Sequence, residues 1–188
     1  MDPISERDRF VIVQKLLAAR LKYYVLDEYT GSPLLYFEQE GFVQFRPSFS
    51  IYRDETKRQK VLSMRQDKFL QLAPTYTVTD SDGRPIGRLV KKFWAFPKSM
   101  WYVYNGAGQE VARAETDTRS ILLSLLIRHG KELANFHILI NGQKIGGVIR
   151  QWAVQDRYIL DLTGDRTHLL DRHLAVCVGV ALDVGEGR

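Results

Sequence analysis

The chain has one cysteine in 188 residues and no long apolar run, and both features limit what it can be. A single thiol cannot form a disulfide within the chain, and Cys177 lies in the most apolar segment, where a thiol usually behaves as a small core hydrophobe. We therefore expect a reducing, cytoplasmic environment. The apolar patch at residues 10–13 is too short for the core of a signal peptide, so none is predicted.

The usual local signatures of catalysis are also missing. The sequence has no G-x-S-x-G, no P-loop, no H-E-x-x-H and no cysteine pair. Gly106 and Gly108 lack the third glycine of a dinucleotide-binding loop, and they follow Tyr104 and Asn105 in a pattern typical of a hairpin turn. His168 and His173 are five residues apart and would point in different directions on one helix. We expect a non-enzymatic protein with no cofactor and no metal site.

The composition is that of an ordinary folded protein. Hydrophobic residues make up 45% and charged residues 26% of the chain, and 188 residues suit a single domain over 1–188. A net charge of +5, from 27 basic and 22 acidic residues, favours anionic partners: lipid headgroups, nucleic acid or acidic proteins. The alternative is that the charge serves only solubility.

One pattern occurs three times along the chain. An aromatic residue begins a stretch of alternating β-formers, a turn with Asp or Asn and Gly follows, and a second apolar stretch comes next. The three copies, each followed by a further strand that returns toward a turn, cover residues 23–35, 76–87 and 136–146, with the return strands at 49–52, 100–104 and 158–162. The recurrence predicts three similar groups of short strands.

Polar and apolar residues alternate along these strands, as they do in a sheet with one face exposed to solvent. In residues 75–79 the threonines occupy one face, while Tyr76 and Val78 occupy the other. Many short strands, frequent turns and no βαβ spacing indicate a mainly β, mostly antiparallel fold, either a barrel or a sandwich.

The segment at residues 167–184 predicts a central helix. From Leu174 onward it is apolar on every side, so it must be surrounded by protein or by lipid. A membrane span needs about 20 apolar residues and this run is roughly half as long, which favours burial inside a β-barrel. Asp165 is expected to cap its start, Asp171 to complement the positive helix end, and Gly185 to terminate it.

Two further segments leave alternatives open. Residues 118–131 have a leucine stripe at helical spacing after Thr118, which indicates a surface helix, with a strand as the alternative. Residues 10–21 can form an N-terminal helix, but residues 10–13 suit an edge strand equally well.

Three stretches together resemble a known family: YYVLDEYTGSPLLYFEQE, YTVTDSDGRPIGRLVKKFW and the closing DLTGDRTHLLDRHLAVCVGVALDVGEG. They are similar to the tubby C-terminal-like superfamily, and within it to the LURP-one-related and phospholipid scramblase-like branch, from about Gln14 to Gly187. The resemblance implies a barrel of about twelve strands around a central hydrophobic helix. It also implies lipid chemistry, because tubby-like proteins bind phosphoinositides and scramblases are linked to calcium-dependent lipid movement.

The chain departs from the scramblase pattern in two respects. It has no proline-rich N-terminal region or cysteine cluster, and a scramblase-like lipid transporter would need a membrane-spanning path that the short apolar helix does not supply. The segment matching the scramblase calcium loop has its glycine at the fourth position rather than the sixth, so it is a weak calcium candidate. Its oxygen-bearing residues are Asp161, Thr163, Asp165 and Asp171, for which helix capping is the preferred role.

The candidate binding residues are basic. Two clusters, the second next to an aromatic residue, comprise Lys57, Arg58 and Lys60, and then Arg84, Arg88, Lys91, Lys92 and Trp94. A Lys or Arg near an anionic leaflet contributes about 1 kcal/mol, and Trp favours the membrane interface. The clusters predict a binding module for anionic phospholipid or for a partner protein, cytoplasmic with peripheral membrane attachment. Nucleic acid is the rival ligand, and a solvated strand edge without any ligand is the plain alternative.

Overall fold

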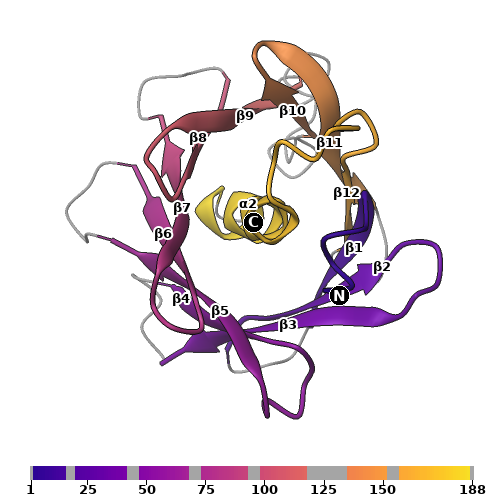
Figure 1. Ribbon diagram of the computed structural model, residues 1–188, viewed down its shortest axis with the longest axis vertical. Helices are drawn as coiled ribbons and strands as arrows, with labels where there is room; N and C mark the ends of the chain where they lie inside the picture. The colour runs from indigo at the N-terminus through magenta and orange to yellow at the C-terminus, as the bar shows by residue number, and fades with distance from the viewer. Residues whose placement is uncertain are drawn as a thin grey trace, which may run out of the picture.

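The computed structural model shows a closed barrel of twelve strands around the C-terminal helix (Figure 1). It describes residues 2–15, 20–41, 47–67, 73–92, 98–117, 135–151 and 157–186. Each strand pairs with its neighbour in antiparallel orientation, in the order β1-β12-β11-β10-β9-β8-β7-β6-β5-β4-β3-β2. The predicted mainly β fold is confirmed, and the barrel replaces the sandwich alternative because no strand in this order is left at an edge.

The twelve strands fall into three groups of four that follow the repeat. The first group is β2 (Lys22–Asp27), β3 (Pro33–Glu40), β4 (Ser48–Tyr52) and β5 (Lys60–Gln66). The second is β6 (Thr75–Asp80), β7 (Pro85–Lys91), β8 (Met100–Asn105) and β9 (Glu110–Thr116). The third is β10 (Phe136–Ile140), β11 (Gln143–Gln151), β12 (Arg157–Asp161) and, from the start of the chain, β1 (Arg9–Gln14).

Strand β1 closes the barrel. It pairs with β12 on one side, where Phe10 lies opposite Leu160, and with β2 on the other, where Ile12 lies opposite Val25. Residues 10–14 are therefore strand and not helix, and they are not at an edge. The predicted surface helix over 118–131 lies outside the described residues.

The turns explain why the repeat was visible in the sequence. In the β2–β3 turn the Asp27 carboxylate accepts hydrogen bonds from the N–H groups of Tyr29 and Thr30, and in the β6–β7 turn Asp80 accepts from Asp82 and Arg84. Such turns suit Asp because its short side chain can bond the backbone two residues on. Gly83 completes the second turn with a φ of +83°, which L-residues with a side chain rarely adopt.

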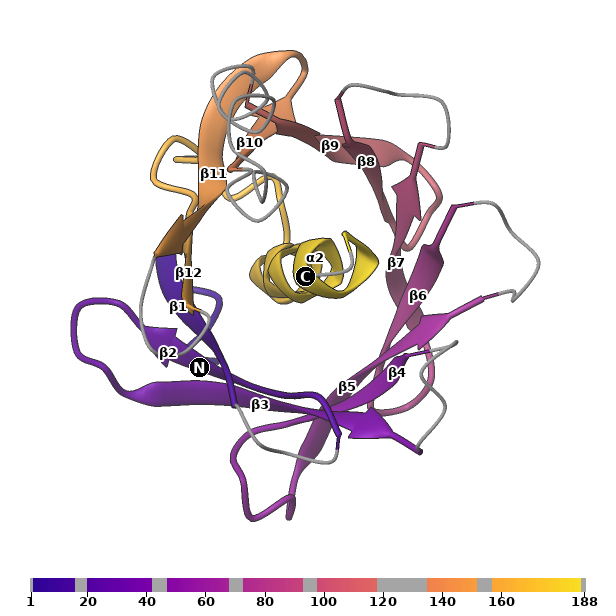
Figure 2. The same cartoon turned by 180° about the vertical axis from the view of Figure 1, so that it is seen from behind.

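The lumen of the barrel holds helix α2 (Arg172–Gly185), which both views show surrounded by strands (Figure 2). Every residue from Leu174 to Asp183 is buried, so the helix has no wet face. Inward-facing side chains such as Tyr76 and Trp101 complete the core around it. A methyl group at Gly179 would clash with the Ile12 side chain of β1, so the strand approaches the helix through this glycine.

The caps of α2 differ in part from expectation. Asp171 is the N-cap and accepts a hydrogen bond from the Leu174 N–H at 2.8 Å, so the helix begins at Arg172 and not near residue 167. Asp165 does not cap the helix; it accepts from the N–H groups of Leu169 and Leu170 and pairs with Arg172 at 2.7 Å. The prediction for Asp165 was wrong because this preceding loop has its own backbone donors to satisfy. Gly185 is the last helical residue and the C-cap is Glu186, so the expected terminating glycine lies one position inside the helix.

No described helix is both long enough and apolar enough to cross a lipid bilayer.

The strand pairing places five turns and the start of α2 at one end of the barrel, here termed the turn end. These turns are β2–β3, β4–β5, β6–β7, β8–β9 and β10–β11. The N-terminal segment also packs at this end, with Ile4 completely buried.

Candidate anion-binding surface

A groove of about 510 Å³ lies on the outer wall of the barrel between β5 and β6. Because Tyr76 and Val78 point into the core, Thr77 and Thr79 of β6 point outward into the groove. The other lining residues come from β5, from the residue after it and from the β6–β7 turn: Lys60, Ser63, Arg65, Asp67 and residues 80–83. Its walls are therefore hydroxyls and charged groups of both signs.

Two arginines flank one threonine across this wall. The pairing of β5 with β6 places Arg65 opposite Thr77, and the pairing of β6 with β7 places Arg88 opposite the same threonine. Adjacent strands are about 4.8 Å apart, so the two arginine Cα atoms are separated by roughly 10 Å. Long guanidinium side chains can converge on one group over that distance. Asp67 joins them, because its carboxylate lies beside both Thr77 and Arg88.

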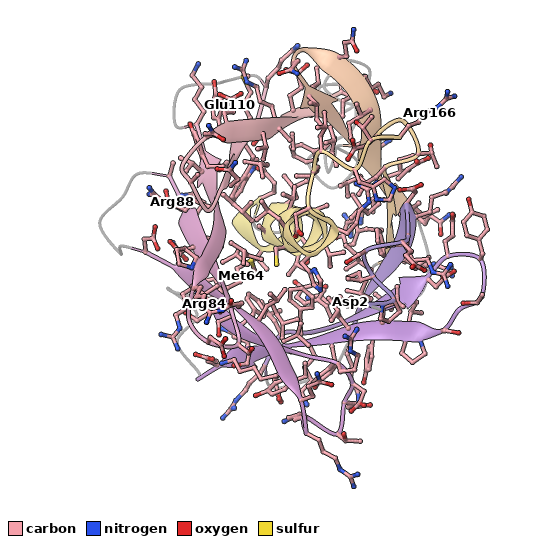
Figure 3. All side chains as sticks on the ribbon, in the orientation of Figure 1. Asp2, Met64, Arg84, Arg88, Glu110 and Arg166 are labelled. Carbon is pink, nitrogen blue, oxygen red and sulfur yellow. The ribbon has the colours of Figure 1, made fainter. Side chains whose placement is uncertain are left out.

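The rim of the groove contributes further charge. Arg84 in the β6–β7 turn is highly exposed and lies 3.4 Å from the Asp82 carboxylate, while Lys60 at the start of β5 lies 3.7 Å from Glu40. Figure 3 shows Arg84 and Arg88 on the same side of the barrel, on its outer surface near β6 and β7. Of the residues predicted from the sequence, Lys60 lines the groove, and Arg84 and Arg88 lie beside it through their pairs with the lining residues Asp82 and Asp67.

The remaining predicted residues lie elsewhere. Lys57 forms an ion pair with Glu38 of β3, and Arg58 is exposed in the same β4–β5 turn. Lys91 faces the lumen and holds the end of the helix: its Nζ donates to the Gly185 carbonyl at 3.0 Å and lies 3.1 Å from Glu186. Lys92 is exposed just after β7, and Trp94 lies outside the described residues.

Arg65 is the functional candidate that the sequence interpretation missed. It is a single arginine between Met64 and Gln66, with no basic cluster around it. Its outward position follows from the alternation of β5, in which Leu62 and Met64 are buried. Its position opposite Thr77, however, depends on how two strands pair, which the sequence does not state.

The calcium candidates are engaged within the protein. Asp161 accepts from the backbone N–H and the hydroxyl of Thr163, Asp171 caps α2, and Asp165 pairs with Arg172. Burial by itself raises the pKa of Asp165, but hydrogen bonds from Arg172 and from the backbone N–H groups of Leu170 and Leu169 outweigh it and lower the pKa. Within the described part of the chain, no group of three His, Cys, Asp or Glu side chains is arranged to hold a metal ion.

The lumen contains a second polar cluster that is sealed from solvent. Asp183 of α2 accepts hydrogen bonds from the hydroxyls of Tyr23 of β2, at 2.6 Å, and Tyr158 of β12. Burial and the nearby Asp183 carboxylate raise the pKa of Tyr23 well above its usual value. Burial likewise raises the pKa of the Cys177 thiol, which is completely enclosed. These groups fix the helix to the barrel wall and are not exposed to a ligand in solution.

The fold is a closed antiparallel β-barrel domain whose lumen is filled by its own C-terminal helix. A family model described as LURP-one-related matches residues 34–183, and the chain belongs to the LURP-one-related family. This membership is compatible with the tubby-like superfamily that the sequence resembles, and with the fold it supports a binding module in general terms. No curated protein matches the chain.

Proposed function

We propose that this protein is a non-enzymatic binding module whose outer-wall groove takes the phosphate-bearing headgroup of an anionic phospholipid, such as a phosphoinositide. The observation that carries the proposal is the placement of Arg65 and Arg88 on either side of Thr77. A guanidinium group forms paired hydrogen bonds to phosphate, and a threonine hydroxyl can donate a further one. Two arginines and a hydroxyl on one wall are a suitable donor set for a phosphate monoester.

The rest of the groove suits a polyol. Ser63 and Thr79 supply hydroxyls, and Asp67 supplies a carboxylate that can accept hydrogen bonds from ring hydroxyl groups. The groove is thus able to bind both parts of an inositol phosphate, the ring and its phosphates. A simple anionic lipid such as phosphatidylserine offers fewer of these contacts.

The position of the groove also favours attachment to a membrane surface. Arg84 and Arg58 lie in turns joined to β6 and β5, which are neighbouring strands, so both turns lie at the turn end of the barrel, and the groove runs from there along the wall to Asp67 at the other end of β5. Each cation near an anionic leaflet contributes about 1 kcal/mol, and the net charge of +5 acts in the same direction. Docking through this side would make the protein peripheral.

Sedimentation with phosphatidylcholine vesicles, with and without phosphatidylinositol bisphosphate, tests the proposal. We expect co-sedimentation only with the phosphoinositide, and a loss of at least about tenfold in affinity for the double variant Arg65→Gln, Arg88→Gln, since two charge-assisted contacts are removed. Lys144→Gln is the control, because Lys144 is an exposed cation on β11, across the barrel from the groove.

Equal partitioning of the wild-type protein to neutral and acidic vesicles at low salt would reject lipid recognition. Binding to an acidic polypeptide, lost in the same double variant and without vesicle binding, would instead support the alternative that the groove recognises a partner protein.

A separate observation favours nucleic acid as a second candidate. Tyr102 and Tyr104 lie on the outward face of β8 with ring centroids 6.5 Å apart, and the Arg113 guanidinium lies 5.1 Å from the Tyr102 ring centroid. Aromatic rings and arginines on one exposed sheet face are typical of surfaces that bind single-stranded nucleic acid. Fluorescence anisotropy with labelled oligonucleotides tests this candidate, and an unchanged signal on titration would exclude it.

A further inference from the structure

The Asp67 carboxylate already occupies the space between the two partners that a phosphate would use. Its Oδ1 accepts a hydrogen bond from the Thr77 hydroxyl at 2.7 Å, and its Oδ2 lies 3.6 Å from Nη2 of Arg88. The two oxygens are thus divided between a hydroxyl and a guanidinium, as two oxygens of a bound phosphate would be. An internal anion stands where the ligand is expected.

The second arginine of the pair is not neutralised in this way. Over the ranges of the chain that the structure describes, no acidic side chain forms an ion pair with Arg65, which is exposed on β5. Arg65, Arg88 and Asp67 together have a net charge of +1. If the charge of Asp67 were removed, the net charge of the three residues would rise from +1 to +2.

We propose that Asp67 is a built-in competitor for the anion site, and that a phosphate group binds by displacing its carboxylate from Arg88 and Thr77. This inference rests on the proposed function, because it describes how access to the same groove is regulated. Its consequence is that the wild-type protein binds phosphate ligands less tightly than its two arginines would allow.

The carboxylate is placed so that it can be displaced. The side chains of Arg88 and Asp67 are 55% and 28% exposed, and exposed ion pairs of this kind are weak because water and salt screen them. The backbone N–H of Asp67 bonds to the Thr75 carbonyl at 2.9 Å, which keeps the main chain in place. Rotation of one side chain is therefore enough to open the site to a stronger, bidentate anion.

The test compares Asp67→Asn with Glu110→Gln. Both variants remove one negative charge from a partly exposed pair with an arginine, but Glu110 pairs with Arg113 on β9, three strands away from β6 and outside the groove. Asparagine retains an oxygen that can accept from Thr77, so the fold is preserved. Two probes separate a lipid from a free phosphate ester: phosphatidylcholine vesicles containing phosphatidylinositol bisphosphate, and soluble inositol trisphosphate.

We expect Asp67→Asn to bind both probes about fivefold more tightly than the wild type, the change expected for loss of one exposed ion pair that competes with the ligand. Glu110→Gln should change the affinity by less than about twofold. If the wild type binds and the two variants bind alike, the competitor role of Asp67 is refuted while the proposed function stands. If neither the wild type nor Asp67→Asn binds either probe, both are refuted.

Discussion

At the scale of single residues, Arg172 is a charged side chain that lies almost completely buried. Its side chain is 2% exposed, and it donates to the carboxylates of Asp165 and Asp8 and to the carbonyls of Arg7 and Leu170. A buried guanidinium is tolerated only when its donors are matched in this way. Arg172 therefore joins the first helical turn to the N-terminal segment.

Replacing Arg172 by methionine should destabilise the protein strongly. The Asp165 carboxylate would remain buried without its partner, and breaking a buried pair in this way costs about 3–5 kcal/mol. Urea unfolding followed by tryptophan fluorescence measures the change in the free energy of unfolding. The exposed Arg166, replaced in the same way, should change it by less than about 0.5 kcal/mol. Equal losses in the two variants would show that the pair contributes little.

At the scale of secondary-structure elements, the contact between α2 and β1 depends on the absence of a side chain at Gly179. A methyl group there would overlap the Cδ1 atom of Ile12. Ile12 is completely buried, so its side chain has little room to rotate away from an added methyl group.

Gly179→Ala should therefore destabilise the protein by about 1–3 kcal/mol, although alanine is the better helix former. Ile12→Val removes the atom that clashes, so the double variant should recover part of the loss. A double-mutant cycle from thermal or urea unfolding measures the coupling. Strictly additive effects would contradict a direct contact between the two positions.

The elements also show what the sequence could and could not predict. Hairpins were predictable because Asp, Asn and Gly at the turns act locally, and the helix was predictable because an all-apolar stretch has to be enclosed. The groove was not, since Arg65 and Arg88 become neighbours of Thr77 only through the pairing of three strands. Lys91 was predicted to be a surface residue of the binding site. On β7, Arg88 and Val90 point outward, so by alternation Lys91 points inward, where it contacts the end of α2.

At the scale of the whole molecule, three carboxylates that make the stability of the fold depend on acid pH lie at the turn end: Asp2, Asp27 and Asp165. The pKa of Asp165 is lowered for the reasons given above. For Asp2 and Asp27, burial by itself raises the pKa, but backbone N–H groups and the nearby Arg53 and Arg7 lower it overall. A carboxyl group with a lower pKa in the folded state stabilises that state once the pH exceeds its unfolded pKa.

We therefore expect the free energy of unfolding to be steady from pH 7 to about pH 5, and to fall below about pH 4 as these carboxylates are protonated, since an ordinary Asp has a pKa of about 3.9. Urea unfolding at a series of pH values measures the curve. Asp27→Asn should flatten its acid limb while lowering stability at pH 7. A main loss of stability between pH 7 and pH 5 would point to histidines instead.

The closure of the barrel by β1 has a consequence for how the protein is made. Strand β1 is synthesised before the other eleven strands and α2 after all of them, so the nascent strands have no helix to pack against until α2 emerges. Until then, exposed apolar faces and unpaired strand edges invite aggregation or capture by chaperones. Folding of the barrel is thus deferred until α2 has been synthesised, and a truncation that removes the helix would leave the strands without the core that they enclose.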